Sequence, residues 1–211
     1  MKKPILFGAN YSVYVRIVQF TLQEKRISYD LIPVDIFDSN SSADDYLERH
    51  PFGKIPSFEH DIFRLYETGA ITRYIDEAFD GPRLQPMNVK QRARMNQIIS
   101  IADGYMYPYF VWGMYGEVII KASKNEPIDK VKLDIAIQKT SCCLAALSTL
   151  LDENFWLSGE QLTLADIYVA PMIDYLIRVP QGQDIFLLYP SLTSWWSRIT
   201  PLMKNIAHQT D

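Results

Sequence analysis

Hydrophobic and polar positions follow two different patterns along the chain, and the change comes near residue 80. Before that point, short apolar runs of strand length are separated by stretches whose apolar residues recur at helical spacing. The predicted order of elements is β-α-β-α-β-β-α. Strands are expected over residues 4–7, 28–34, 55–59 and 62–65, and helices begin at Ser12, near Tyr46 and at Glu67.

The remainder of the chain shows long helical patterns and no convincing strand. A polar stretch from Asp80 to residue 88 is typical of a linker, so we expect two domains, 1–80 and 89–211. Thr163 and Asp166 precede an apolar run and predict a capping box, with Asp in place of the usual Glu. Helices are predicted over 88–123 with strain near Pro108, over 129–151 with apolar positions Val131, Leu133, Ile135, Leu144, Leu147 and Leu151, and around 191–199.

Composition narrows the classes of protein that fit. With 48% apolar residues the chain can bury a core, and a net charge of -4 with mixed signs favours neither nucleic acid nor an anionic membrane as partner. No stretch approaches the roughly 18 apolar residues of a membrane span, so we expect a cytoplasmic protein. Cys142 and Cys143 are adjacent in a predicted helix and are expected to be core or half-buried thiols. The scattered histidines predict no metal site.

Ser12 stands where the first helix begins, next to Tyr11. It can cap the helix, or it can donate a hydrogen bond to a thiolate with help from the helix N-terminus. The two roles are compatible because they use different parts of the hydroxyl group. Lowering a free thiol pKa from about 8.5 by about 2 units requires roughly 2.7 kcal/mol, which a charge-assisted hydrogen bond and helix-terminus amides can supply.

Two further positions have both a structural and a functional interpretation. Pro56 opens a strand after Ile55, and a cis bond there would leave the Ile55 backbone free to pair with a peptide-like ligand, although most X-Pro bonds are trans. Glu67 and Thr68 lie at a helix start, where they can bind the ammonium and carboxylate groups of an amino acid or simply cap the helix.

An aromatic and Met-rich stretch over residues 105–115 is too apolar for a solvated helix face. Part of it must be core, and the remainder can line an apolar pocket together with Tyr11 and Tyr14. The pocket residues that we select are Tyr14, Tyr107, Phe110 and Trp112.

Four segments in order together resemble the glutathione transferase superfamily over essentially the whole chain. Residues 8–18 resemble the opening of its serine-type classes, phi especially, and residues 50–56 resemble the family's "NPFGxVP" segment with its cis-proline. Residues 65–75 resemble "LxESxAIxxYI", the γ-glutamyl site, and residues 156–166 resemble the folding motif of the helical domain. The resemblance implies an α/β thioredoxin-like N-terminal domain, an all-α C-terminal domain and a homodimer.

The resemblance also assigns roles. Ser12 would stabilise the glutathione thiolate, with Tyr11 as an alternative hydroxyl, and the backbone of Ile55 before Pro56 would pair with the cysteinyl unit. Glu67 and Thr68 would bind the γ-glutamyl end. The loop stretch Asn40-Ser41-Ser42-Ala43 lacks the basic residues that phi-type proteins carry there, so the glycyl carboxylate would fall to Lys54. Phe52 is a candidate dimer contact.

The expected activity is conjugation of the glutathione thiolate to small hydrophobic electrophiles, with glutathione as co-substrate and no metal or other cofactor. Glutathione-dependent peroxidase or isomerase activity from the same thiolate is an alternative. A catalytically silent relative that uses the fold for binding or scaffolding is the alternative of a different class. Retention of Ser12, Pro56, Glu67 and Thr68 favours the enzyme.

Overall fold

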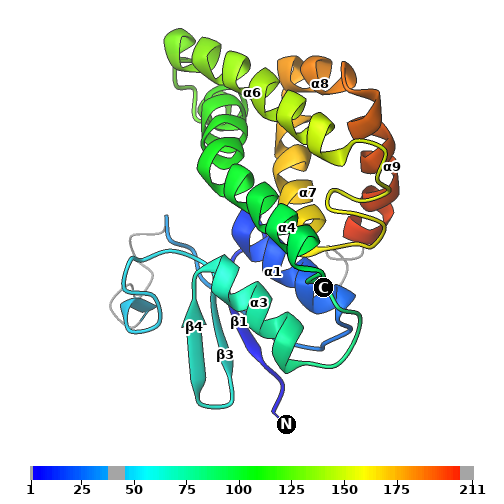
Figure 1. Ribbon diagram of the computed structural model, residues 1–211. Coiled ribbons are helices and arrows are strands. Elements are labelled where there is room, and N and C mark those ends of the chain that lie inside the picture. The colour runs from blue at the N-terminus through cyan, green and yellow to red at the C-terminus, as the bar shows by residue number, and fades with distance from the viewer. Residues whose placement is uncertain (1, 38–45, 205–211) are drawn as a thin grey trace. The chain divides into compact units, whose positions relative to one another are not determined.

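A computed structural model describes residues 2–37 and 46–204, and these residues form two compact units that meet in sequence between Leu84 and Gln85 (Figure 1). The first unit contains a sheet and two helices, and the second is helical. The predicted polar loop over residues 38–42 lies outside the described residues. Tyr46 and Leu47, which were predicted to be helical, are helical.

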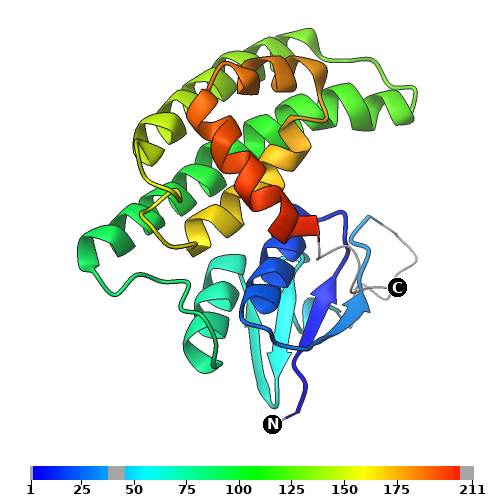
Figure 2. The same cartoon turned by 90° about the vertical axis from the view of Figure 1, so that its right-hand side faces the viewer.

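The first unit is built on a four-stranded sheet in the order β2-β1-β3-β4. β1 is parallel to β2 and antiparallel to β3, and β3 is antiparallel to β4. Figure 2 shows both helices on the same side of the sheet. The elements are β1 (Ile5–Gly8), α1 (Val13–Glu24), β2 (Asp30–Pro33), β3 (Ser57–His60), β4 (Phe63–Tyr66) and α3 (Thr68–Ala78), which confirms the predicted strands and helices within the described residues.

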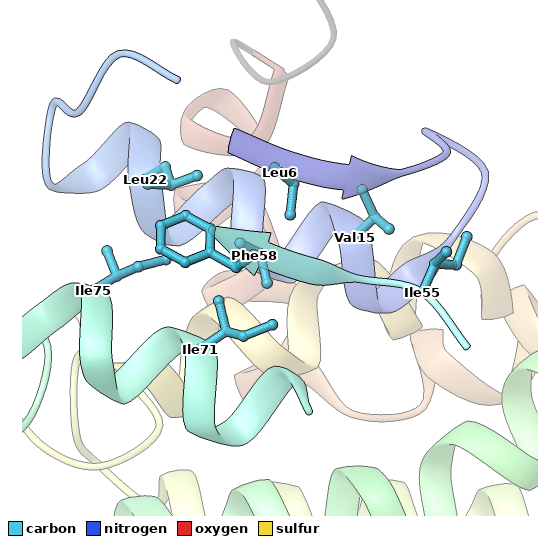
Figure 3. Packing of buried hydrophobic residues seen from close by; sticks show 8 residues of the cluster. Leu6, Val15, Leu22, Ile55, Phe58, Ile71 and Ile75 are labelled. Carbon is cyan, nitrogen blue, oxygen red and sulfur yellow. The ribbon is translucent and has the colours of Figure 1, made fainter. Parts of the chain in front are cut away.

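The core of this unit lies between the sheet and the two helices (Figure 3). Apolar positions at helical spacing on α1 meet the inward side chains of β1 and β3, and α3 packs beside α1 on the same face of the sheet. Each buried Leu, Ile or Phe contributes roughly 1.5–3 kcal/mol through removal of apolar surface from water. The cluster consists of Leu6, Val15, Val18, Leu22, Ile55, Phe58, Ile71 and Ile75.

A buried ion pair joins the C-terminal ends of α1 and α3. The side chains of Lys25 and Asp76 are each only 2% exposed, and their Nζ and Oδ1 atoms lie 3.3 Å apart. Lys25 Nζ also donates to the Asp76 carbonyl at 2.9 Å, and Asp76 Oδ1 accepts the backbone N–H of Leu84 at 2.8 Å. The Asp76 carboxylate therefore joins the ends of two helices to the backbone of Leu84, where the long segment of the first unit ends.

The second unit contains one continuous helical segment whose N-cap, Asn88, lies where the sequence predicts the helix to begin. The segment passes through α4 (Val89–Ile101), the π-helical η1 (Ala102–Ile120) and α5 (Lys121–Ser123). Pro108, where strain was predicted, lies inside η1. Proline disturbs an α-helix, because it has no N–H to donate to the helical hydrogen bonds and its ring collides with a carbonyl of the preceding turn. The other helices are α6 (Lys130–Leu151), α7 (Leu164–Leu176), α8 (Pro180–Leu187) and α9 (Pro190–Lys204).

Two expectations about α6 need correction. Val131 and Ile135 were counted with the apolar positions of this helix, but they are 71% and 48% exposed, because the face packed on η1 and α8 is the one that carries Leu144 and Leu147. Cys142 is exposed rather than half-buried, whereas Cys143 is buried and burial raises the pKa of its thiol to about 11.

The predicted capping box at the start of α7 is present. Asp166 is fully buried, and its Oδ2 atom accepts the Thr163 N–H at 2.9 Å and the Thr163 hydroxyl at 3.0 Å. Its Oδ1 atom accepts the Leu157 N–H at 2.8 Å and the indole N–H of Trp195 at 2.9 Å. Burial raises the pKa of Asp166, and the four donors act against that effect. The carboxylate thus joins α7, α9 and the segment before α7.

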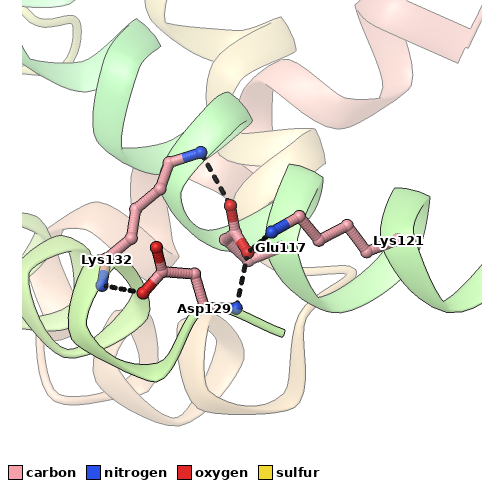
Figure 4. Close-up of polar contacts among 4 residues, drawn as sticks. All are labelled: Glu117, Lys121, Asp129 and Lys132. Carbon is pink, nitrogen blue, oxygen red and sulfur yellow. Dashed lines mark hydrogen bonds and ion pairs between the residues drawn. The ribbon is translucent and has the colours of Figure 1, made fainter. Parts of the chain in front are cut away.

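A second buried carboxylate, Glu117, joins η1 to the start of α6 (Figure 4). Its side chain is 1% exposed and contacts Lys121 Nζ at 2.6 Å and Lys132 Nζ at 2.7 Å. It also accepts the backbone N–H of Asp129, the N-cap of α6, at 3.0 Å. Burial alone would raise the pKa of Glu117, but the hydrogen bonds from Lys121, Lys132 and Asp129 outweigh it and lower the pKa to about 2.

We predict that Asp166→Asn lowers the free energy of unfolding by about 3 kcal/mol, because the amide must face two of the four buried donors with a donor of its own. Chemical denaturation measures the change. The matched control is Asp174→Asn on the same helix, whose exposed ion pair with Arg178 should contribute less than about 1 kcal/mol. Equal losses in both variants would contradict the role given to Asp166.

We predict that the contribution of Glu117 to the free energy of unfolding decreases as the pH is lowered. The folded-state pKa of about 2 lies below the ordinary value of 4.5, so the contribution is complete above about pH 4.5 and is lost as the pH falls toward 2. The difference in unfolding free energy between the wild type and Glu117→Gln should therefore shrink across that window. A pH-independent difference for Glu117→Gln would count against the ionised cluster.

Candidate functional site

The pairing of the strands brings the predicted site residues of the first unit to one end of the sheet. Phe7 is opposite Ser57, and Ser57 is opposite Tyr66, so the end of β1, the start of β3 and the end of β4 coincide. Gly8 is opposite Pro33, which adds the end of β2 to the same edge. The segments that follow or precede these strand ends carry Tyr11, Ser12, Lys54, Ile55, Pro56, Glu67 and Thr68.

Gly8 allows the turn between β1 and α1 to be tight. A Cβ atom at this position would lie 2.4 Å from Cγ2 of Val15, well inside any tolerated contact. Only glycine therefore lets the first turn of α1 pack directly on the strand that precedes it. The consequence is that Ser12, the residue before the helix, is held close above the end of β1.

Ser12 is the N-cap of α1 and is half-buried. Its backbone N–H donates to the Ala9 carbonyl at 2.9 Å, and its Oγ atom accepts the Val15 N–H at 3.4 Å, a long cap bond. In this bond Oγ is the acceptor, so its hydrogen remains available for donation to an anion. The positive end of the helix dipole lies at the same point and favours such an anion.

Tyr11 is oriented by a different partner. Its hydroxyl donates to Oδ1 of Asp35 at 2.8 Å, and its ring lies 5.8 Å from that of Phe37. Asp35 also accepts the Phe37 N–H at 2.9 Å, and this bond, followed by that from Tyr11, lowers the pKa of the Asp35 carboxyl. Sequence reasoning missed Asp35, because no pattern marks a single acidic residue after an edge strand as the acceptor of a distant tyrosine.

The bond between Ile55 and Pro56 is cis, as the resemblance implied. Within residues 2–37 and 46–204, no backbone hydrogen bond reaches the N–H or C=O of Ile55. The preceding residue, Lys54, is exposed, and its carbonyl accepts the Tyr46 hydroxyl at 2.8 Å. The backbone before β3 is therefore anchored on one side of Ile55 while the peptide groups of Ile55 itself remain open.

Glu67 adopts an unusual backbone conformation at the N-terminus of α3. Its φ and ψ angles are 71° and 115°, outside the small left-handed region in which non-glycine residues are usually found. The side chain is exposed and forms no cap hydrogen bond, so Glu67 does not cap α3 through its side chain. Thr68, only 7% exposed, begins the helix, whose first N–H groups lack intrahelical acceptors.

An aromatic cluster of His50, Phe52 and Tyr66 lies next to Glu67. The ring of Tyr66 is 5.0 Å from that of His50 and 6.1 Å from that of Phe52, which is 68% exposed. Burial lowers the pKa of His50, and the Glu67 carboxylate acts in the opposite direction. His50 was not selected as a site residue, because a histidine without a second ligand at a metal-binding interval is usually a packing residue.

The expected pocket residues differ in their exposure. Tyr14 on α1 is half-buried, and on η1 Tyr107 is half-buried while Trp112 is 40% exposed. The rings of Tyr107 and Trp112 form an edge-to-face pair at 6.4 Å. Phe110 has no exposed surface, so its ring belongs to the core of the helical unit, and its selection as a pocket residue is corrected.

The described residues contain neither a candidate metal cluster nor a helix that could cross a membrane. In residues 2–37 and 46–204, no three His, Cys, Asp or Glu side chains lie together in a metal-binding arrangement. In the same part of the chain, every helix is too short or too polar to cross a bilayer.

Comparison with known proteins finds one family in both units. Residues 6–83 match the model "Glutathione S-transferase, N-terminal domain", and residues 112–202 match "Glutathione S-transferase, C-terminal domain". Glutathione S-transferase F7 of Arabidopsis thaliana is 28% identical over 200 residues, which cover 92% of this chain and 93% of that protein.

Solved structures show the same fold across both units. Glutathione transferase F7 from Populus trichocarpa superposes with a TM-score of 0.86 at 26% identity and covers 99% of both chains. Maize glutathione S-transferase I, solved in complex with an atrazine glutathione conjugate, also has a TM-score of 0.86, at 22% identity, and covers 98% of this chain and 97% of its own. The two units are thus a thioredoxin-like sheet domain and a helical domain.

We predict that Glu67→Gly is more stable than Glu67→Ala by about 1 kcal/mol. Alanine removes the side chain but keeps the Cβ atom that disfavours this conformation, whereas glycine adopts it without strain. The comparison of the two variants cancels the loss of the carboxylate, and thermal or urea unfolding measures the difference. If the alanine variant were the more stable one, the backbone of Glu67 would not be strained.

Proposed function

The chain belongs to the glutathione transferase superfamily, and from this premise we propose that it is a serine-type, phi-like transferase that conjugates glutathione to small hydrophobic electrophiles. The observation that supports the proposal most directly is the placement of Ser12 as the N-cap of α1, at the end of the sheet that also carries Ile55, Glu67 and Thr68. The maize relative holds a glutathione conjugate in its structure, which supports the same class of product.

In this proposal the hydroxyl that donates a hydrogen bond to the glutathione thiolate is that of Ser12 rather than that of Tyr11. The Ser12 hydroxyl accepts only a long bond from Val15 and keeps its hydrogen, whereas the Tyr11 hydroxyl donates its one hydrogen to Asp35. Moving the Tyr11 hydrogen to sulfur would leave Asp35 with one donor fewer. Ser12 can stabilise a thiolate while its cap bond remains intact.

The remainder of glutathione would be bound along the same edge. The open N–H and C=O of Ile55 would pair with the cysteinyl unit as a short stretch of added strand. The exposed Glu67 carboxylate would bind the γ-glutamyl ammonium group, and Thr68 with the first N–H groups of α3 would bind its carboxylate. Lys54 is exposed and would bind the glycyl carboxylate. The stretch Asn40-Ser41-Ser42-Ala43 lies outside the described residues.

The reaction is a nucleophilic attack by sulfur on carbon. The thiol proton leaves to solvent when glutathione binds, the thiolate forms the C–S bond, and the electrophile releases its leaving group or accepts the electron pair. Binding both substrates makes the step effectively unimolecular, which supplies much of the acceleration. We propose that the electrophile makes apolar contacts with Tyr14, Tyr107 and Trp112. A cytosolic location of the protein is also part of the proposal.

A homodimer is part of the proposal. Phe52 is 68% exposed and contacts the rings of His50 and Tyr66 edge-on, so it projects from a preformed aromatic base. Exposed large aromatic residues supported in this way are typical of residues that insert into a partner. We assign Phe52 to the contact with a second copy of the chain.

We predict that Ser12→Ala reduces kcat/KM for glutathione and an aryl chloride by about 100-fold, the equivalent of roughly 2.7 kcal/mol of thiolate stabilisation. The ultraviolet thiolate band of bound glutathione should disappear at neutral pH, while calorimetry should show that glutathione still binds. A thiolate band that survives in this variant would contradict the role of Ser12.

The matched control is Tyr11→Phe, which removes the hydroxyl that donates to Asp35. We expect this variant to keep the thiolate band and to change kcat/KM by less than about tenfold. Loss of the band in Tyr11→Phe, but not in Ser12→Ala, would transfer the role to Tyr11. If the wild type binds no glutathione at all, the transferase proposal fails and a scaffold role for the fold becomes the better account.

A further inference from the structure

The outward face of α6 carries an apolar stripe where a solvated helix should be polar. Positions 131, 135, 138, 142, 145 and 149 are all exposed. Because each residue advances by 100°, this alternation of four and three residues keeps them within about 40° of one line along the helix. The buried residues, Ala136, Thr140, Cys143, Leu144, Leu147 and Leu151, lie on the opposite side. The stripe consists of Val131, Ile135, Gln138, Cys142, Ala145 and Thr149.

The residue types of the stripe are not explained by the helix or by solubility. Val131 is 71% exposed and Ile135 is 48% exposed, and β-branched residues are poorer helix formers than the Lys, Glu or Gln expected at such positions. Ile128, just before the helix, is 43% exposed and extends the stripe toward its N-terminus. Figure 1 shows α6 along the upper margin of the helical unit. The face opposite the stripe packs on η1 and α8.

The spacing of the stripe is that of a two-stranded coiled coil. Ile135, Cys142 and Thr149 fall at a positions of a heptad, and Val131, Gln138 and Ala145 fall at d positions. The seam contains two polar residues, Gln138 near its middle and Thr149 at its end. A polar residue in the middle of a seam, here Gln138, fixes the register of pairing, because its amide is satisfied only opposite another polar group. The partner that offers Gln at the same place is a second copy of this helix.

The charges beside the stripe select the parallel orientation. Asp134 falls at a g position and Lys139 at the e position five residues later, the spacing at which g and e side chains meet across a parallel pair. Neither side chain forms an ion pair with another described residue, and both are exposed. Two identical helices side by side would form two Asp134–Lys139 pairs. In an antiparallel pair centred on Gln138, Asp134 would face the neighbourhood of Cys142 instead.

We propose that the outward face of α6 is a self-association surface, at which two copies of this chain pair their α6 helices in parallel and in register through the stripe. The pair has a twofold axis, so Cys142 of one copy lies beside Cys142 of the other. A single helix pair of this length is at the low end of stable interfaces, below about 1,200 Å², so association should depend on protein concentration. The stripe does not include Phe52, which belongs to the other unit, and the proposal does not depend on the transferase activity.

The test uses the full-length protein and a short bis-maleimide, which links two thiols by adding each to a maleimide double bond. We expect a covalent dimer whose yield rises with protein concentration and which Cys142→Ser abolishes. The matched control is Cys143→Ser, because the neighbouring thiol is buried and should not contribute. Absence of the covalent dimer at every concentration would overturn the proposal.

Charge reversal tests the orientation. Asp134→Lys places two like charges across each pair and should reduce the covalent dimer at least fivefold, and the double variant Asp134→Lys, Lys139→Asp should restore it. Ile135→Glu should abolish it, whereas Leu188→Glu, an exposed apolar position at the end of α8, should leave it unchanged. Each variant is checked for a wild-type circular dichroism spectrum and melting temperature.

The remaining outcomes are equally decisive. If Ile135→Glu prevents association but the charge reversal does not, parallel pairing is wrong. If neither variant changes the yield, cross-linking reports random collision and the stripe does not mediate self-association. Phe52→Ala should leave the Cys142 cross-link in place, and loss of the cross-link in that variant would place Cys142 in the Phe52-dependent dimer instead.

Discussion

The antiparallel pairing of β1, β3 and β4 is the constraint on which the site depends. Because Phe7, Ser57 and Tyr66 lie in one row, three segments that are far apart in sequence emerge at one end of the sheet. A shift of one residue in the pairing of β1 with β3 would turn Phe58 out of the core and separate Ser12 from Ile55. The hydrophobic cluster beneath the sheet therefore sets the geometry of the polar edge above it.

Much of this fold could be predicted from periodicity, because α1, α3 and the helices of the second unit carry apolar residues at helical spacing, and the capping box of α7 at Thr163 is recognisable in the sequence. The sequence could not predict which face of each helix is turned toward the core. On α6, both faces are rich in apolar residues, so the pattern that includes Val131 and Ile135 has no unique inward side. Only packing against η1 decides it, and Gly113, whose Cβ would lie 2.6 Å from that of Ala136, shows how closely the two helices approach.

At the candidate site, features that depend on neighbouring residues in the sequence could be predicted. Features that depend on contacts between distant residues could not. Ser12 follows from helix capping, and Pro56 and Thr68 from resemblance to known motifs. The bond from Tyr11 to Asp35 joins residues 24 positions apart, and the positive φ angle of Glu67 has no signature in the residue type. Phe110 was placed in the pocket because an aromatic run does not reveal which of its rings face inward.

The buried pair of Lys25 and Asp76 has a consequence for how this sequence can change over evolutionary time. Replacing either residue alone leaves an unpaired charge in the core, which costs roughly 3–5 kcal/mol, whereas a matched apolar pair is tolerated. The two positions are thus expected to vary together or not at all among descendants of this chain. Asp76 also accepts the N–H of Leu84, so an apolar replacement of the pair would in addition leave this backbone group without its acceptor. Sequence change is therefore restricted at two positions that are not part of the candidate site.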